Sequence, residues 1–194
     1  MIIDVSHHQG VIDWATAAPH VELAIIRASV AAHADDKAER NWTEARKHGV
    51  TCGLYHYYQH GVPLRDQLHA CSEAIHPGAL YEAECVVLDV EYAGPDEPYP
   101  NLLDASDFDP VLEWLFVMAH WHGKMPWVYT SKYSWPFVEA SEIGSYPLWV
   151  ADYSRETPRL PLQWSRCALH QYSSTERCPG VPTLVDANRR PAKC

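Results

Sequence analysis

The chain has 194 residues, of which 47% are hydrophobic and 21% charged, and its formal net charge is −10. This length can bury a sizeable core without a metal or a disulfide, and no apolar run approaches the ~20 residues of a membrane span. The acidic balance, with no cluster of Lys or Arg, argues against nucleic acid or an anionic membrane surface as a partner. We therefore predict one domain over residues 1–194, with no membrane insertion.

Short β-rich runs alternate with helical patterns along the chain. Asp35 or Asp36 can cap a first helix, a second runs from about residue 63 to 75, and the third is capped by Asp109 and ends at Gly123. The third helix is apolar on nearly every side, which is typical of a helix packed between a sheet and its neighbours. Eight segments have the β-branched and aromatic character of strands: residues 2–6, 23–29, 51–58, 85–92, 125–131, 148–154, 167–173 and 182–188.

The alternation of strands and helices in the first two thirds predicts a parallel sheet with right-handed crossovers. Eight strands favour closure of the sheet into a barrel. Because only about three good helices are present, the predicted fold class is α/β, an irregular eight-stranded β/α (TIM-like) barrel with a reduced set of outer helices. The loops at the C-terminal strand ends of such a barrel form the functional site.

The segment CVVLDVEY, residues 85–92, carries Asp89 and Glu91 in an otherwise apolar strand. Side chains alternate between the two faces of a strand, so both carboxylates share the face of Val87, and Val86, Leu88 and Val90 lie on the other. An ionisable group is costly to bury unless it is paired or solvated. Two acids on one side of a buried strand therefore indicate a cleft.

Three further strands carry an acid at or near the C-terminal end: Asp4, Asp152 and Asp186. The first and last strands are neighbours in a closed barrel, so Asp4 and Asp186 should lie side by side, across the opening from Asp89 and Glu91. A ring of carboxylates in an aromatic cleft is typical of glycosidic bond cleavage, in which one acid protonates the leaving oxygen and another stabilises the cationic sugar. Because neighbouring acids cannot all ionise freely, we expect one raised pKa.

Seven ordered segments resemble the motifs of glycoside hydrolase family 25, the Chalaropsis-type lysozymes or N-acetylmuramidases. The order, spacing and total length all agree with that family, although His7 and His8 stand where other small or polar residues are common. The segments are DVSHHQGVIDW (4–14), GLYHYY (53–58), VLDVEY (87–92), YTSKY (129–133), LWVADY (148–153), HQYSS (170–174) and VDAN (185–188).

The resemblance implies a lysozyme that hydrolyses the β-1,4 bond between N-acetylmuramic acid and N-acetylglucosamine in bacterial peptidoglycan, without a cofactor. Glu91 matches the general acid. Asp89 matches the acid that assists the N-acetyl group or the cationic sugar, and we expect it to stay charged. Asp4 and Asp186 match the remaining acids of the cleft, whose negative field keeps Glu91 protonated. The motifs leave attack by water or by the substrate's own N-acetyl group open. Expected sugar contacts, for which a structural role is the alternative, are Tyr57, Tyr129, Trp149 and Gln171.

Two other functions compete with this interpretation. His56 and His60 have the HxxxH spacing of a metal-dependent polysaccharide deacetylase, but in a strand they lie about 13 Å apart, too far to share one ion, so we predict no metal site. The second alternative is a non-catalytic peptidoglycan-binding barrel. Four crowded acids argue against it, since a binding module does not need them.

The N-terminus lacks the apolar region of a signal peptide. This is typical of a phage endolysin made in the host cytoplasm and acting on the cell wall, with a secreted enzyme as the alternative. We expect a monomer without a separate wall-binding domain. Among the six cysteines, Cys52 and Cys85 are expected as free core thiols, Cys167 and Cys178 could form a bridge, and Cys71 and Cys194 are left open.

Overall fold

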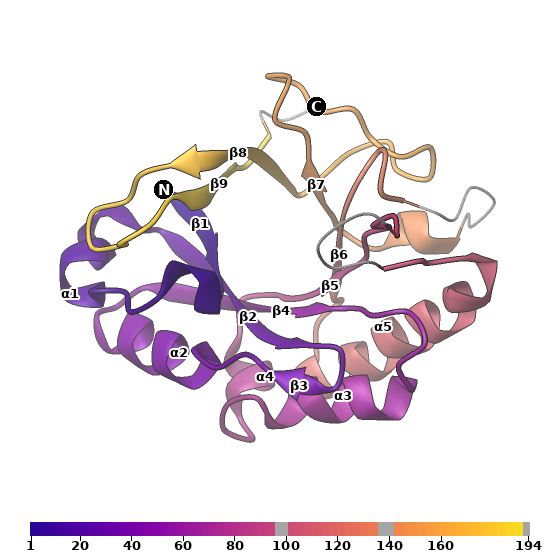
Figure 1. Cartoon of the computed structure of the whole chain (residues 1–194), viewed down its shortest axis with the longest axis horizontal. Coiled ribbons are helices and arrows are strands. Elements are labelled where there is room, and N and C mark those ends of the chain that lie inside the picture. The colour runs from indigo at the N-terminus through magenta and orange to yellow at the C-terminus, as the bar shows by residue number, and fades with distance from the viewer. Residues whose placement is uncertain (96–100, 136–141, 192–194) are drawn as a thin grey trace.

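A computed structural model of the chain describes residues 1–95, 101–135 and 142–191. Within them, eight strands close into a barrel, because β1 pairs with β2 as well as with β9 (Figure 1). The predicted irregular α/β barrel is therefore confirmed, and a two-residue strand β3 (His33–Ala34) is added beside β2. The barrel strands are β1 (Ile2–Val5), β2 (Leu23–Val30), β4 (Thr51–Tyr57), β5 (Val86–Asp89), β6 (Trp127–Ser131), β7 (Leu148–Ala151), β8 (Leu169–Glu176) and β9 (Val185–Arg189).

The last strand departs from the parallel arrangement. Neighbouring pairs from β1–β2 around to β7–β8 are parallel, whereas β9 is antiparallel to both β8 and β1. A short connection without a crossover helix joins β8 to β9, so the chain turns back on itself. Asp186 therefore lies near the N-terminal end of β9 rather than at a C-terminal end. The reversal still brings it to the barrel mouth, where it is the register partner of Asp4.

Helices cover only part of the barrel. Figure 1 shows them on the side formed by the first two thirds of the chain, whereas the arc of β7, β8 and β9 has no long helix beside it among the described residues. The three predicted helices correspond to α2 (Ala38–Lys47), α3 (Leu64–Glu73) and α5 (Phe108–His122). The short helical turns are α1 (Trp14–Ala17), α4 (Ala79–Glu82) and the 3-10 turns η1 (His7–Gln9), η2 (Ala18–His20), η3 (Ala105–Asp107) and η4 (Glu142–Ser145).

The predicted helix caps were wrong in two places. Lys37 is the N-cap of α2, because the Asp35 carboxylate accepts from the Lys37 N–H and pairs with Arg27 instead. Helix α5 begins earlier than expected, with Asp107 at its N-cap. Its apolar character also overstated its burial, since Phe116 on its outer side is 73% exposed.

The barrel interior is apolar at its base and polar at its mouth. The inner cluster is formed by Ile2, Leu23, Ile25, Cys85, Val87, Tyr129, Trp149 and Leu169. Strand β5 alternates as predicted, because Val87 belongs to this cluster while Val86, Leu88 and Val90 belong to the larger core outside the barrel. A Cβ at Gly53 would lie 2.6 Å from Cys85 Sγ, so the floor is packed too closely there for a larger residue. Toward the C-terminal strand ends, interior positions become polar.

Cys167 and Cys178, the two cysteines that the sequence allows to form a bridge, are not joined by a disulfide. Cys52 and Cys85 are buried free thiols, as expected, and Cys71 is a third. Cys178 is also a free thiol and is not bridged to Cys167, while Cys194 lies outside the described residues. No helix in the described part of the chain has the length and apolar character needed to cross a membrane.

Candidate active site

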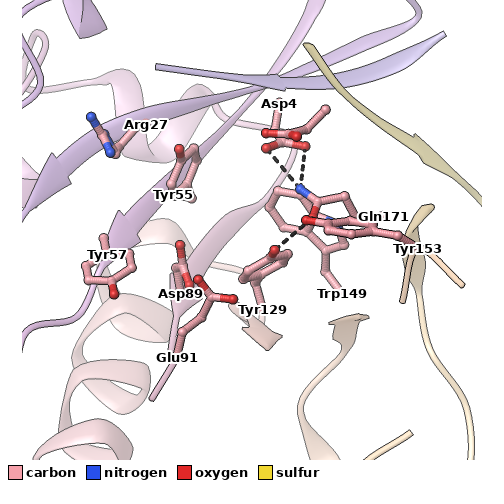
Figure 2. Close-up of a pocket in the computed structure, with 11 residues that line it drawn as sticks. Asp4, Arg27, Tyr55, Tyr57, Asp89, Glu91, Tyr129, Trp149, Tyr153 and Gln171 are labelled. Atoms are coloured by element: carbon pink, nitrogen blue, oxygen red, sulfur yellow. Dashed lines mark hydrogen bonds between the residues drawn. The ribbon is translucent and has the colours of Figure 1, made fainter. Parts of the chain in front are cut away.

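A polar cavity of about 280 Å³ opens at the C-terminal ends of the parallel strands (Figure 2). All eight residues predicted for the site line it: the acids Asp4, Asp89, Glu91 and Asp186, and the expected sugar contacts Tyr57, Tyr129, Trp149 and Gln171. Three further lining residues were missed: Arg27, Tyr55 and Tyr153. Each of these three continues the interior-facing alternation of its strand, as Arg27 does after Leu23 and Ile25, so the period-two pattern could have identified them.

Asp4 is held by two side-chain amides. Gln171 Nε2 lies 3.0 and 3.2 Å from its two carboxyl oxygens, and Asn188 Nδ2 donates to Oδ2 at 2.8 Å. Burial and the neighbouring Asp186 carboxyl raise the pKa of Asp4 to about 8. Burial raises the pKa of Asp186 as well, but the hydrogen bond between the two acids adds to the rise at Asp4 and opposes the rise at Asp186, so the shared proton favours Asp4.

The two amides are oriented by aromatic side chains. Tyr129 and Tyr153 donate their hydroxyl protons to Gln171 Oε1 at 2.8 and 2.7 Å, and Trp149 Nε1 donates to Asn188 Oδ1 at 2.7 Å. With both acceptor oxygens engaged, each amide must present its N–H groups to Asp4. Tyr129 and Trp149 therefore have a positioning role in the structure, through the amides, in addition to lining the cavity.

Asp89 is a buried acid with a carboxyl oxygen that lacks a hydrogen-bond donor among the described residues. The residue is 6% exposed, and the oxygen is Oδ1. Burial, followed by the charges of Glu91 and Asp4, raises its pKa well above the usual range, and the Arg27 guanidinium opposes this only in part. Burial therefore favours the protonated form of Asp89, in contrast to the sequence-based expectation that it stays charged.

Glu91 lies two residues beyond the end of β5 and still faces the cavity (Figure 2). Its backbone is fixed by Asn101, whose Nδ2 donates to the carbonyl oxygens of Glu91 and Tyr58 at 3.0 and 2.7 Å. Burial and then the charge of Asp186 raise the pKa of Glu91 to about 7. Near neutral pH this carboxyl can therefore hold a proton and release it.

Arg27 brings a positive charge to the edge of this acidic cavity. Its Nε donates to Asp35 Oδ2 at 2.8 Å, and its Nη2 lies 2.5 Å from His7 Nδ1. The backbone N–H of His7 also donates to Asp35 Oδ2, at 3.1 Å. The guanidinium is thus held on one side and lines the cavity on the other.

The remaining sequence candidates lie outside the cavity. Asp152 does not join the ring of acids, because it forms an ion pair with Arg159. His56 is a core residue whose ring nitrogens meet Ser29 Oγ and Gln67 Oε1 at 2.8 and 3.1 Å, while His60 Nδ1 lies 2.8 Å from Asp107 Oδ2. Across the described ranges, no three His, Cys, Asp or Glu side chains are grouped so as to hold a metal ion.

Comparisons with known proteins agree with this geometry. The family described as glycosyl hydrolases family 25 matches residues 3–181. The uncharacterized protein YegX of Escherichia coli O157:H7 is 28% identical over 197 residues, 96% of this chain and 67% of YegX. Lysozyme M1 of Streptomyces globisporus is 26% identical over 201 residues, 96% of this chain and 66% of that protein.

The fold itself has a solved counterpart. The crystal structure of the bacterial lysozyme from Streptomyces coelicolor aligns with 98% of this chain and 91% of its own, at a TM-score of 0.81 and 23% identity. The family match spans most of the chain and includes all of the predicted acids except Asp186. The chain therefore belongs to glycosyl hydrolase family 25 and is a glycoside hydrolase.

Proposed function

We propose that this glycoside hydrolase is a lysozyme, an N-acetylmuramidase that cleaves the β-1,4 bond between N-acetylmuramic acid and N-acetylglucosamine in bacterial peptidoglycan. The observation that carries the proposal is the pairing, in one cavity, of Glu91, whose pKa is raised to about 7, and a buried oxygen of Asp89 that has no donor within the described ranges. The first can protonate a leaving oxygen. The second can accept a hydrogen bond from a bound substrate.

In this proposal Glu91 is the general acid. Its protonated carboxyl donates to the glycosidic oxygen while the bond from that oxygen to the anomeric carbon of N-acetylmuramic acid breaks, and N-acetylglucosamine leaves as the alcohol. Glu91 becomes a carboxylate and then acts as the base for the incoming water. Its raised pKa suits both steps, because the proton is neither lost before the reaction nor held too tightly.

Asp89 is proposed to assist the substrate's own N-acetyl group. An ionised Asp89 accepts from the acetamido N–H, so the amide oxygen becomes more nucleophilic and bonds to the anomeric carbon as the leaving group departs. The cationic ring formed in this way is stabilised by the nearby negative charge. The acetamido N–H of a bound substrate donates to Oδ1, which has no donor among the described residues, and so favours the ionised form.

Asp4 and Asp186 are proposed to set the electrostatics rather than to contact the breaking bond. Asp4 holds the proton that the two acids share, which leaves the negative charge on Asp186. That charge is one of the two causes that raise the pKa of Glu91. The sequence-based hypothesis of a negative field around Glu91 is thus retained and assigned mainly to Asp186.

Mass spectrometry of borohydride-reduced peptidoglycan digests tests the reaction. A muramidase leaves N-acetylmuramitol at the new ends, whereas a glucosaminidase leaves N-acetylglucosaminitol. A deacetylase removes acetyl groups without shortening the chains, and a non-catalytic barrel leaves the polymer unchanged. The proposal requires muramitol ends and activity that survives EDTA.

A peptidoglycan substrate places the activity at a bacterial cell wall. A phage endolysin released from the host cytoplasm and a monomeric state stay predictions. They are tested by size-exclusion chromatography with light scattering and by lysis of bacterial cells from outside with the purified protein.

A further inference from the structure

A cavity of about 480 Å³ lies on the outer side of strands β8 and β9. His170 lines it, whereas the next residue, Gln171, lines the catalytic cavity. Arg189 lines it as well, whereas the residue before it, Asn188, faces the barrel interior, where it donates to Asp4. Because side chains alternate along a strand, this cavity and the catalytic one lie on opposite faces of the same two strands. No long helix among the described residues covers this arc of the barrel (Figure 1).

The Arg189 guanidinium is held on the wall of the outer cavity by uncharged groups. Its Nε donates to His170 Nδ1 at 3.3 Å, its Nη2 donates to the backbone carbonyl oxygen of Glu156, and its carbon lies 5.0 Å from the centre of the Tyr172 ring. His170 Nε2 lies 2.8 Å from the carbonyl oxygen of Asp152. Since a carbonyl oxygen only accepts, Nε2 carries the ring proton and Nδ1 is the acceptor for Arg189. Burial also lowers the pKa of His170, which keeps its ring neutral.

Arg166 adds a second guanidinium to the outer cavity. Neither Arg166 nor Arg189 forms an ion pair with a carboxylate of the described residues, whereas Arg190, which also lines the cavity, pairs with Glu22. Glu156 lines the cavity too, but within the described ranges its carboxylate forms no ion pair with either arginine. The chain has a formal net charge of −10, so acidic partners are abundant. Two arginines that lack one in the same cavity therefore indicate an anion supplied by a ligand.

The rest of the lining indicates what kind of anion fits. Pro158, Leu160 and Pro191 contribute apolar side chains to the wall of the outer cavity. A ligand with small apolar groups beside its charge is suited to such a wall, because it buries apolar surface as its charge meets the guanidinium groups. The planar fork of an arginine also matches the two oxygens of a carboxylate. The stem peptides of peptidoglycan combine these features, since they carry free carboxylates next to alanine methyl groups.

We propose that the outer cavity binds a peptidoglycan stem peptide, with a free carboxylate of the peptide on Arg166 and Arg189 and its alanine methyl groups against the apolar wall. The inference rests on the proposed function, which makes peptidoglycan the substrate. The site takes no part in the bond cleavage. A peptide bound there holds the enzyme on the cell wall independently of the glycan strand in the catalytic cavity, so the two contacts add to the retention of the enzyme.

An NMR titration with a synthetic stem pentapeptide tests the site without turnover. We expect the backbone amide signals of residues 165–170 and 189–190 to shift, and the affinity to fall at least about fivefold when the free carboxylates of the peptide are amidated. Arg166→Glu should weaken binding of the acidic peptide by a similar factor, because it places a like charge beside the carboxylate. Arg65→Glu, at an exposed arginine on α3, makes the same change in net charge and should bind the peptide as the wild type does.

Three results would overturn the peptide site. The first is equal binding of the acidic and the amidated peptide, and the second is unchanged affinity in both Arg166→Glu and Arg189→Gln. The third is binding of poly(glycerol phosphate) but not of the peptide, which would make the ligand a phosphate polymer. The proposed function is tested separately with a peptidoglycan tetrasaccharide that carries no peptide. Arg166→Glu should cleave it at the wild-type rate, and failure of the wild-type protein to cleave it would count against the muramidase, not against the peptide site.

Discussion

Asp89 and Asp152 occupy similar places in the sequence and opposite environments in the structure. Asp89 is the last residue of β5, and Asp152 directly follows β7. Asp152 accepts hydrogen bonds from Arg159 and Ser154, and the Arg159 guanidinium holds its pKa well below the usual range. Oδ1 of Asp89 has no donor in the part of the chain that the structure describes, and burial raises the pKa of this carboxyl.

The difference follows from which face of its strand each acid occupies. In β7, Trp149 and Ala151 face the barrel interior, so the next interior position is Tyr153 and Asp152 points the other way. In β5, Val87 faces the interior and Asp89 follows it there. Asp152 on the outer face is therefore paired with Arg159, whereas Asp89 on the inner face lines the cavity.

The largest effect is expected at Glu91, an inner-face acid. Glu91→Gln removes the proton donor while keeping size and burial, so we predict a loss of kcat of about 10³-fold with little change in the affinity for peptidoglycan. The measurement is release of reducing ends, together with a pull-down on insoluble peptidoglycan. Glu39→Gln, at an exposed carboxyl on α2, is the matched control. Normal turnover in Glu91→Gln would assign the acid elsewhere.

Asp89→Asn should have the next largest effect on activity, about 10²-fold in kcat, because it removes the charge that stabilises the cationic sugar but leaves the acid in place. Assistance by the N-acetyl group also predicts that the first-formed product of the wild-type enzyme has the β configuration, which proton NMR detects before mutarotation. Asp36→Asn, at an exposed aspartate, serves as control. A first product of α configuration would mean direct attack by water.

The alternation of side chains between the two faces of each strand predicted much of this site from the sequence. The features that it did not predict depend on contacts between residues far apart in the chain. The spacing of Asp89 and Glu91 placed both in the cavity, and the aromatic motifs located Tyr129 and Trp149. The reversal of β9 was not predictable from its own residues, since strand direction depends on the connection and on both neighbours. The ion pair between Asp152 and Arg159 was not predictable either, because Arg159 lies in an irregular segment that contacts Asp152 only in the folded chain.

Replacing Asp89 and replacing Asp152 should change the thermal midpoint of unfolding in opposite directions. The pKa of Asp89 is higher in the folded protein than in the unfolded chain. Its carboxyl therefore contributes stability that is fully present below the unfolded-state pKa and is lost as the pH rises through the folded-state pKa. Asp89→Asn should therefore raise the thermal midpoint at pH 8 by several degrees and change it less at pH 5. Asp152→Asn should lower the midpoint by a similar amount at pH 5 and pH 8, because the lowered pKa of Asp152 marks a charge that stabilises the fold above the ordinary Asp range and is lost only in acid. Calorimetry at both pH values tests the pair, and the same sign in both variants would contradict the distinction.

The smallest effect is expected from Asp186→Asn, on the pH profile. Glu91 must be protonated to act, so kcat/KM should fall as pH rises through its pKa of about 7. Asp186 raises that pKa by its negative charge, and a neutral side chain there should move the alkaline limb to lower pH by less than about one unit. The Asp152→Asn variant is the matched control, since the charge of Asp152 is not among the causes that shift the pKa of Glu91. An unchanged alkaline limb in Asp186→Asn would mean that burial alone sets the pKa of Glu91, and that the inner-face acids act on the substrate separately rather than through one another.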